Sequence, residues 1–127
     1  MSAYAKINLL SIKNSSETEG LESHFARKYI ESRDIGVSLF RYAPNFQAQG
    51  AHSHKVQEEV YVVVHGSGSI LLNEEAINIT LWDAIRVAPE VVRTFRAGPE
   101  GLDILAIGGP KPSEGDGVRQ TPHWPAS

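Results

Sequence analysis

Short apolar segments recur along most of this 127-residue chain, and glycine, proline, aspartate or asparagine separates each from the next. From residue 35 onward they follow one another at intervals of about 8–12 residues, which favours an antiparallel sandwich or barrel. Beyond that point no stretch has sustained helical periodicity. The pattern predicts strands at residues 35–42, 60–64, 69–72, 76–81, 84–87, 91–96 and 102–107.

The two ends of the chain have weaker patterns than its middle. Residues 1–20 combine a short apolar start with a polar loop, and residues 22–30 alternate either as a strand, which we favour, or as one face of a helix. Residues 110–127 contain four of the seven prolines, so we expect an irregular arm that packs on the surface or is disordered. We expect one domain, 1–127, with its core at about residues 35–108.

Composition and charge exclude several classes of function. The chain has no cysteine, which excludes disulfides and thiolate sites and fits a reducing compartment. Its formal net charge is -3 and it has no run of lysine or arginine, so neither nucleic acid nor an anionic membrane is an expected partner. No apolar stretch approaches the roughly 18–20 residues that span a bilayer, and no signal peptide is recognisable. We therefore expect a cytoplasmic protein.

Two histidines and a carboxylate are the clearest candidate site. His52 and His54 are two positions apart, so an extended segment directs both imidazoles to the same side. Glu59 follows a few residues later, immediately before the apolar run of residues 60–64. Two imidazoles and one carboxylate on one sheet surface form an incomplete site for a first-row metal ion.

The same segment resembles the first motif of the cupin family. That motif has a glycine, His-x-His, three or four intervening residues, a glutamate, six intervening residues and a glycine. Here the matching positions are Gly50, His52, His54, Glu59 and Gly66. The opening glycine lies closer to the first histidine than is usual in the family. The resemblance implies that His52, His54 and Glu59 are metal ligands.

The second cupin motif is degenerate in this chain. Residues 82–97 occupy its place, and Pro89 is displaced by one position. Arg93 stands where the family has its third metal-binding histidine, and Ala97 stands where it has asparagine. The resemblance covers about residues 35–108. It implies an all-β, antiparallel double-stranded β-helix, which is a jelly-roll barrel with a pocket at one end, flanked by an irregular N-terminal segment and C-terminal tail.

Arg93 decides between two forms of the site. By motif position its guanidinium points inward, where it either pairs with Glu59 in place of a metal charge or binds a carboxylate or phosphate of a ligand. Tyr61 follows Glu59 on the same face, and with Tyr42 it is a further candidate for orienting a ligand. We therefore assign Arg93, Tyr61 and Tyr42 to ligand binding, and we assign no catalytic residue.

An outward-facing valine stripe suggests self-association. If Glu59 and Tyr61 face inward, Val60, Val62 and Val64 face outward, and an exposed valine stripe on a sheet promotes association. Cupins commonly bury such a surface, so we expect a two-fold homodimer. Coverage by the N-terminal segment or by the tail is the alternative.

Two functions remain open at this point. One is a metal-dependent enzyme that holds Fe, Mn, Ni or Zn and acts on a small anionic or oxygenated metabolite. The other is a metal-free small-molecule-binding protein, a sensor or isomerase-like protein, in which Arg93 and the histidines donate hydrogen bonds to an anion. Neither needs an organic cofactor, and fold analogy alone does not decide whether the protein is an enzyme.

Overall fold

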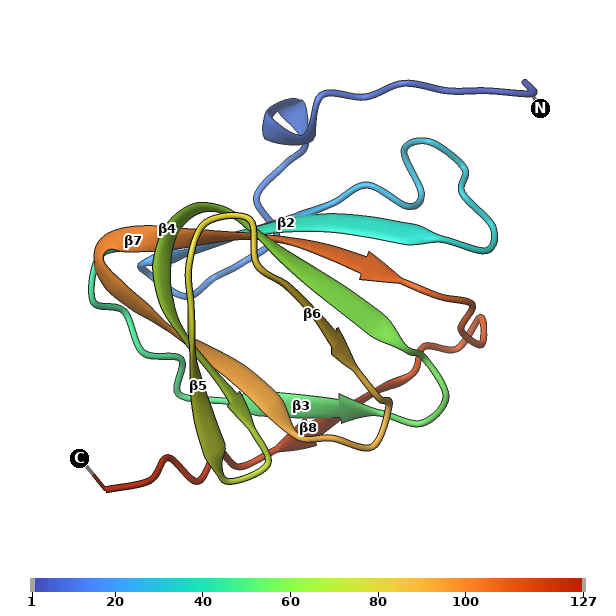
Figure 1. The fold of residues 1–127 in the computed structure, drawn as a ribbon. Helices are drawn as coiled ribbons and strands as arrows, with labels where there is room; N and C mark the ends of the chain where they lie inside the picture. Colours follow the sequence, from blue (N-terminus) through green and yellow to red (C-terminus); the bar gives the residue numbers. More distant parts are fainter. Residues whose placement is uncertain (1, 127) are drawn as a thin grey trace.

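The computed structural model describes residues 2–126, and strands form nearly all of their regular structure (Figure 1). A single turn of 3-10 helix, η1, spans Leu9–Ser11. The strands are β1 (Leu21–Phe25), β2 (Gly36–Tyr42), β3 (Ala51–His54), β4 (Glu59–Leu72), β5 (Glu75–Ile79), β6 (Ala84–Val87), β7 (Arg93–Gly108) and β8 (Gly117–Gln120). Within the described residues, no helix has the length and apolar character needed to cross a membrane.

Two long strands, β4 and β7, organise one antiparallel sheet that curls into a barrel (Figure 1). They pair along almost their whole length, from Glu59 opposite Gly108 to Leu72 opposite Arg93. Along its edges β4 also pairs with β5 and β6, whereas β7 also pairs with β2 and β3. The remaining strands extend the order to β1-β2-β7-β3-β8. The expected all-β jelly-roll barrel is therefore confirmed.

A bulge lets β4 and β7 bend without a break. The register between them shifts at Val63/His65 and again at Gly66/Gly68. At Gly66 φ is +74°, and an added Cβ would lie 2.0 Å from the carbonyl oxygen of Gly101. Only glycine fits both the left-handed backbone and this close approach of the two strands. The final glycine of the first motif therefore has a structural role at the bend.

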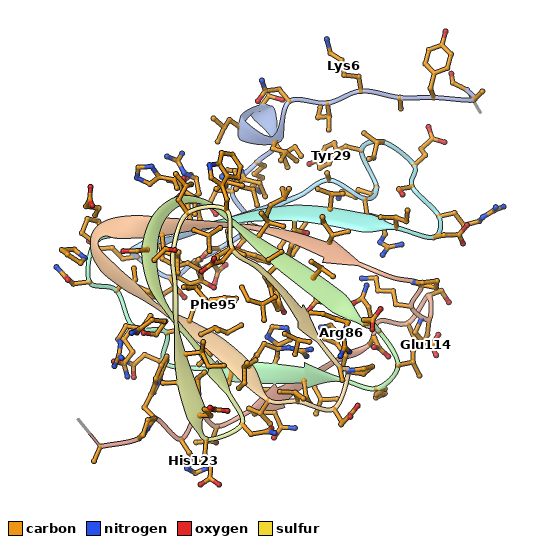
Figure 2. All side chains as sticks on the ribbon, viewed as in Figure 1. Lys6, Tyr29, Arg86, Phe95, Glu114 and His123 are labelled. Atoms are coloured by element: carbon orange, nitrogen blue, oxygen red, sulfur yellow. The ribbon has the colours of Figure 1, made fainter. Side chains whose placement is uncertain are left out.

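Alternation along the strands separates the core from the surface, as predicted. Tyr61 and Val63 are buried. The alternate positions, Val60, Val62 and Val64, are half-buried. Side chains from β4 to β7 form the core, where Figure 2 labels Phe95. The buried members are Tyr61, Val63, Ile70, Ile79, Val87, Phe95, Ala97, Leu102, Ile104 and Ala106. Each large apolar side chain buried there stabilises the fold by about 1.5–3 kcal/mol.

The observed elements differ from the expected ones in four main places. The segments predicted at 60–64 and 69–72 form one strand, β4, and those at 91–96 and 102–107 form one strand, β7, because the bulge continues the pairing. In the 22–30 segment the favoured strand is confirmed only as far as Phe25, where turns begin. The proline-rich tail is not irregular throughout, because β8 pairs with β3 in register.

Candidate metal centre

The three predicted ligands meet at one end of the barrel. β3 supplies His52 and His54, and Glu59 is the first residue of β4. Their ligand atoms lie within 4.8 Å of one another. The Oε1 atom of Glu59 is 3.6 Å from Nε2 of His52 and 3.0 Å from Nε2 of His54. The turn between β3 and β4 folds this group together, since the three residues belong to consecutive strands.

The donor set fits a metal ion in its chemistry as well as in its position. The side chains of His54 and Glu59 are about nine-tenths buried, and His52 is more accessible. Both ring nitrogens of His54 are buried, and neither makes a well-aligned hydrogen bond within the described residues. Each nitrogen faces a carboxylate, with Nε2 3.0 Å from Glu59 and Nδ1 3.4 Å from Asp116. A metal ion would take Nε2 and the Glu59 carboxylate as ligands.

Glu59 carries the negative charge that such an ion requires. Burial raises the pKa of Glu59, but the adjacent imidazoles of His52 and His54 and the hydrogen bond from the Tyr61 hydroxyl outweigh that effect and hold the pKa below its ordinary range. The Tyr61 hydroxyl donates to Oε1 of Glu59. The carboxylate is therefore ionised at neutral pH and is oriented by Tyr61.

Asp116 is a part of the site that sequence reasoning missed. It lies just before β8, and its fully buried carboxylate is 3.4 Å from Nδ1 of His54. The same carboxylate accepts the backbone N–H of Val56 at 3.0 Å and that of Gln57 at 2.7 Å. Burial raises the pKa of Asp116, but these two N–H groups and the nearby His54 lower it more. One carboxylate from the tail thus holds both the His54 ring and the turn that leads to Glu59.

The only local sign of this role was an aspartate between two glycines, Gly115 and Gly117, in a tail that resembles a linker. A carboxylate on the far nitrogen of a metal-bound histidine fixes its tautomer and raises its basicity. With the proton on Nδ1 facing Asp116, the Nε2 lone pair of His54 is left free on the side of Glu59.

Arg93 is buried as predicted, but it contacts backbone carbonyls rather than pairing with Glu59. The guanidinium donates to the carbonyl oxygens of Val87, Ala88 and Pro89 at 3.5, 3.0 and 3.4 Å. No ion pair joins it to Glu59 among the residues that the structure describes. The turn at the displaced proline presents three carbonyl acceptors to the two terminal nitrogens, whereas the buried Nε has no hydrogen-bond partner among the described residues. Arg93 still lies opposite His52 in the β3–β7 pair.

Two cavities adjoin the ligand group and share the side chains of His52 and Phe40. The larger, of about 930 Å³, is also lined by His54 and Glu59. The smaller, of about 430 Å³, is lined by the two predicted ligand-binding tyrosines, Tyr42 and Tyr61. Arg93 lines neither cavity. Burial raises the pKa of both tyrosines, so each presents a neutral hydroxyl.

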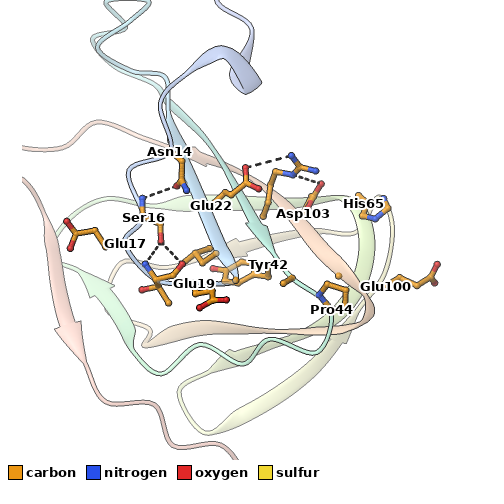
Figure 3. A pocket seen from close by; sticks show the side chains of 16 residues that line it. Asn14, Ser16, Glu17, Glu19, Glu22, Tyr42, Pro44, His65, Glu100 and Asp103 are labelled. Atoms are coloured by element: carbon orange, nitrogen blue, oxygen red, sulfur yellow. Dashed lines mark hydrogen bonds and ion pairs between the residues drawn. The ribbon is translucent and has the colours of Figure 1, made fainter.

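A third cavity, of about 550 Å³, lies apart from the ligand group (Figure 3). Its lining is acidic, but two of its carboxylates are already paired. Nη1 of Arg41 is 3.8 Å from Glu22 and Nε of Arg41 is 3.3 Å from Asp103, as the dashed lines show. The histidine in its wall, His65, is exposed and does not approach the carboxylates of the metal group.

Comparison with known proteins supports the fold more strongly than any one function. No protein-family model matches the chain, and no curated protein sequence does. Solved structures do match. A cupin protein from Bacteroides fragilis is 23% identical with a TM-score of 0.72, and the match covers 89% of each chain. The polyketide cyclase RemF from Streptomyces resistomycificus is 14% identical with a TM-score of 0.75, covering 92% of this chain and 84% of that one.

A third solved structure extends the range of similar proteins to a larger enzyme. The salicylate 1,2-dioxygenase from Pseudoaminobacter salicylatoxidans is 14% identical with a TM-score of 0.66, and the match covers 76% of this chain but 27% of that one. These similarities, together with the curled antiparallel sheet and the His-x-His and Glu positions on it, establish that this chain has the cupin fold.

Proposed function

We propose that this protein binds a divalent first-row transition metal ion through His52, His54 and Glu59 and uses the adjoining cavities to bind a small anionic or oxygenated molecule. The observation that carries the proposal is the convergence of the three ligand atoms within 4.8 Å, with the side chains of His54 and Glu59 about nine-tenths buried. Two histidines and one carboxylate suit Fe, Mn, Ni or Zn and leave coordination positions open for a ligand. A bound ion would supply Lewis-acid or oxygen-activating chemistry there.

The residues around the ligands each have a role in this proposal. Asp116 keeps the proton of His54 on Nδ1, and Tyr61 orients the Glu59 carboxylate by donating its hydroxyl proton. The accessible ring of His52 lines both cavities, so a ligand in either one would lie beside a proposed metal ligand. Two of the similar solved structures bear enzyme names, a cyclase and a dioxygenase, which supports a metal-dependent enzyme as one form of the proposal.

One observation favours a second, metal-free function. Glu59 already contacts both histidines and Tyr61, so its charge is compensated by protein groups. In that form the histidines donate hydrogen bonds to an anion, and the protein is a small-molecule-binding sensor or an isomerase-like protein. Arg93 would then act on the anion only after leaving its three carbonyl partners, which makes it a weaker candidate than the histidines.

Elemental analysis of untagged protein separates the two forms. Stoichiometric metal that is lost in His54→Ala and Glu59→Gln supports the metal site. Protein that stays metal-free after incubation with Fe, Mn, Ni and Zn, and whose melting temperature is unchanged by chelator, supports the second form.

We also propose that the protein is a two-fold homodimer. The valine stripe on β4 is half-buried within one chain, so it offers less apolar surface than the sequence pattern suggested. Leu81 and Trp82, at the turn between β5 and β6, are 48% and 70% exposed and add apolar surface to the molecule. Burial of such residues between two copies is the proposed reason for association.

A further inference from the structure

The smaller cavity beside His52 has an unusually aromatic wall. Five aromatic side chains line it, which is half of the ten in the whole chain. They come from β2, β4, β7 and the segment between β2 and β3, and they are Phe40, Tyr42, Phe46, Tyr61 and Phe95. We refer to this cavity as the aromatic chamber. Residues so distant in the sequence converge there only through the fold.

The rings pack as aromatic pairs rather than as a random apolar surface. Tyr61 meets Phe95 edge to face, with centroids 5.1 Å apart at 83°. Tyr42 lies 5.7 Å from Phe95 and 5.9 Å from Phe46. These spacings fall in the range that favours edge-to-face and offset contacts, and a planar ring in the chamber would extend the same arrangement.

The size of the chamber sets the size of the ring. A cavity of about 150 Å³ is enough to hold benzene. The chamber has a volume of about 430 Å³, so it accommodates one ring with substituents or two fused rings.

The charge of the chamber selects an anion. No aspartate or glutamate lines it, whereas Arg119 does. Arg119 on β8 lies opposite His52 on β3, is exposed, and makes no ion pair within the part of the chain that the structure describes. Five carboxylates line the cavity of Figure 3, which adjoins the chamber through Thr18, Leu21 and Tyr42. Cations also line the larger cavity, but only three Phe or Tyr rings do, against five in the chamber, so the chamber combines a cation with the most aromatic wall.

A polar group is also free on the chamber wall. The Tyr42 hydroxyl is half-buried and has no hydrogen-bond partner within the described residues, and burial alone raises its pKa. The Tyr61 hydroxyl is already committed to Glu59. Tyr42 is thus the donor available to a ligand oxygen.

We infer that the ligand is a small aromatic acid whose ring occupies the aromatic chamber and whose carboxylate lies between Arg119 and the position of the metal beside His52. This inference names the ligand class of the proposed metal site. The ligand carboxylate has two anchors, the metal ion and Arg119, and the first of them rests on the proposed function. The other anchor, Arg119, belongs to the protein alone, so aromatic acids bind the metal-free protein as well, about tenfold more weakly.

Calorimetric titration of 1-naphthoate, benzoate and cyclohexanecarboxylate into metal-loaded and metal-free protein tests the inference. We expect the two aromatic acids to bind at least tenfold more tightly than cyclohexanecarboxylate. Arg119→Gln should weaken 1-naphthoate about tenfold by removing a charge-assisted hydrogen bond, and Tyr42→Leu should weaken it about tenfold by removing a ring contact. Tyr42→Phe, which keeps the ring, should lose less than Tyr42→Leu.

Two surface variants are matched controls. Arg86→Gln removes an arginine that is paired with Glu58 away from the chamber, and Tyr4→Leu removes a ring that is 88% exposed. Both should bind 1-naphthoate as the unmodified protein does. Thermal unfolding of every variant identifies any loss of affinity that comes from misfolding.

The outcomes separate this inference from the metal proposal. If metal analysis shows one bound ion and no aromatic acid binds, or if cyclohexanecarboxylate binds equally well, the inference is wrong and the metal proposal stands. If no metal binds but 1-naphthoate still binds with dependence on Arg119 and Tyr42, the metal proposal is wrong and the chamber assignment stands.

Discussion

Replacing Asp116 tests whether the C-terminal tail is part of the metal site. In the native protein Oδ2 of Asp116 accepts hydrogen bonds from the N–H groups of Val56 and Gln57 and lies 3.4 Å from Nδ1 of His54. In Asp116→Asn, the side-chain amide oxygen can take the place of Oδ2. The turn between β3 and β4 therefore keeps its hydrogen bonds, and the negative charge beside His54 is lost. Asp116→Ala removes the charge and both hydrogen bonds together.

The contacts set the expected magnitudes. Loss of a group that orients a histidine ligand costs about 10–100-fold in metal affinity. We expect Asp116→Asn to fall near the tenfold end, because the ring is still positioned but its basicity is reduced. Asp116→Ala should fall near the hundredfold end and also lower the melting temperature of the metal-free protein, because two backbone N–H groups in the turn lose their acceptor.

Competition between the protein and a coloured zinc chelator measures these affinities, with thermal unfolding of the metal-free protein as the second readout. Glu114→Gln is the matched control, since Glu114 lies in the same tail, is exposed and contacts only Ser113. Zinc affinities of Asp116→Asn and Asp116→Ala equal to that of Glu114→Gln would refute the role of the tail, whatever happens to stability.

Three further predictions follow from the fold. Gly66→Ala should lower the free energy of unfolding by about 2–5 kcal/mol, because the left-handed backbone disfavours a side chain and the new Cβ clashes with Gly101. An unchanged midpoint in urea unfolding would contradict the close approach of β4 and β7 at Gly66. Arg93→His should raise nickel or zinc affinity, because position 93 lies opposite His52 and loses a positive charge; unchanged affinity would mean that the new ring does not reach the ion. Sedimentation should show a dimer, and a monomer at high protein concentration would exclude the proposed association.

The strands and the grouping of the two histidines could be predicted because both depend on local rules. The period-two pattern around Tyr61 and Val63 identifies the buried face without knowledge of strand pairing. The two-residue spacing of His52 and His54 directs both imidazoles to one side of β3 for the same reason, whereas Glu59 was identified through the resemblance to the cupin motif and is brought to them by the turn between the two strands.

The parts that could not be predicted depend on contacts between distant segments. Asp116 reaches His54 only because β8 pairs with β3, and a tail rich in proline and glycine carries no strand pattern. The partners of Arg93 are backbone carbonyls of a turn, which have no residue-type signal. The glycines at this point of the sequence predict a turn, whereas in the fold Gly66 lies at a bulge inside one long strand.

Zinc titration of the unmodified protein beside Glu58→Gln and Glu59→Gln is the most direct test of the metal site. The two glutamates are adjacent, but Glu58 is exposed and paired with Arg86, whereas Glu59 contacts both histidines. We predict one bound zinc ion in the unmodified protein and in Glu58→Gln, and at least a hundredfold loss of affinity in Glu59→Gln. Equal affinity in the two variants, or no binding in any of the three proteins, would contradict the metal site.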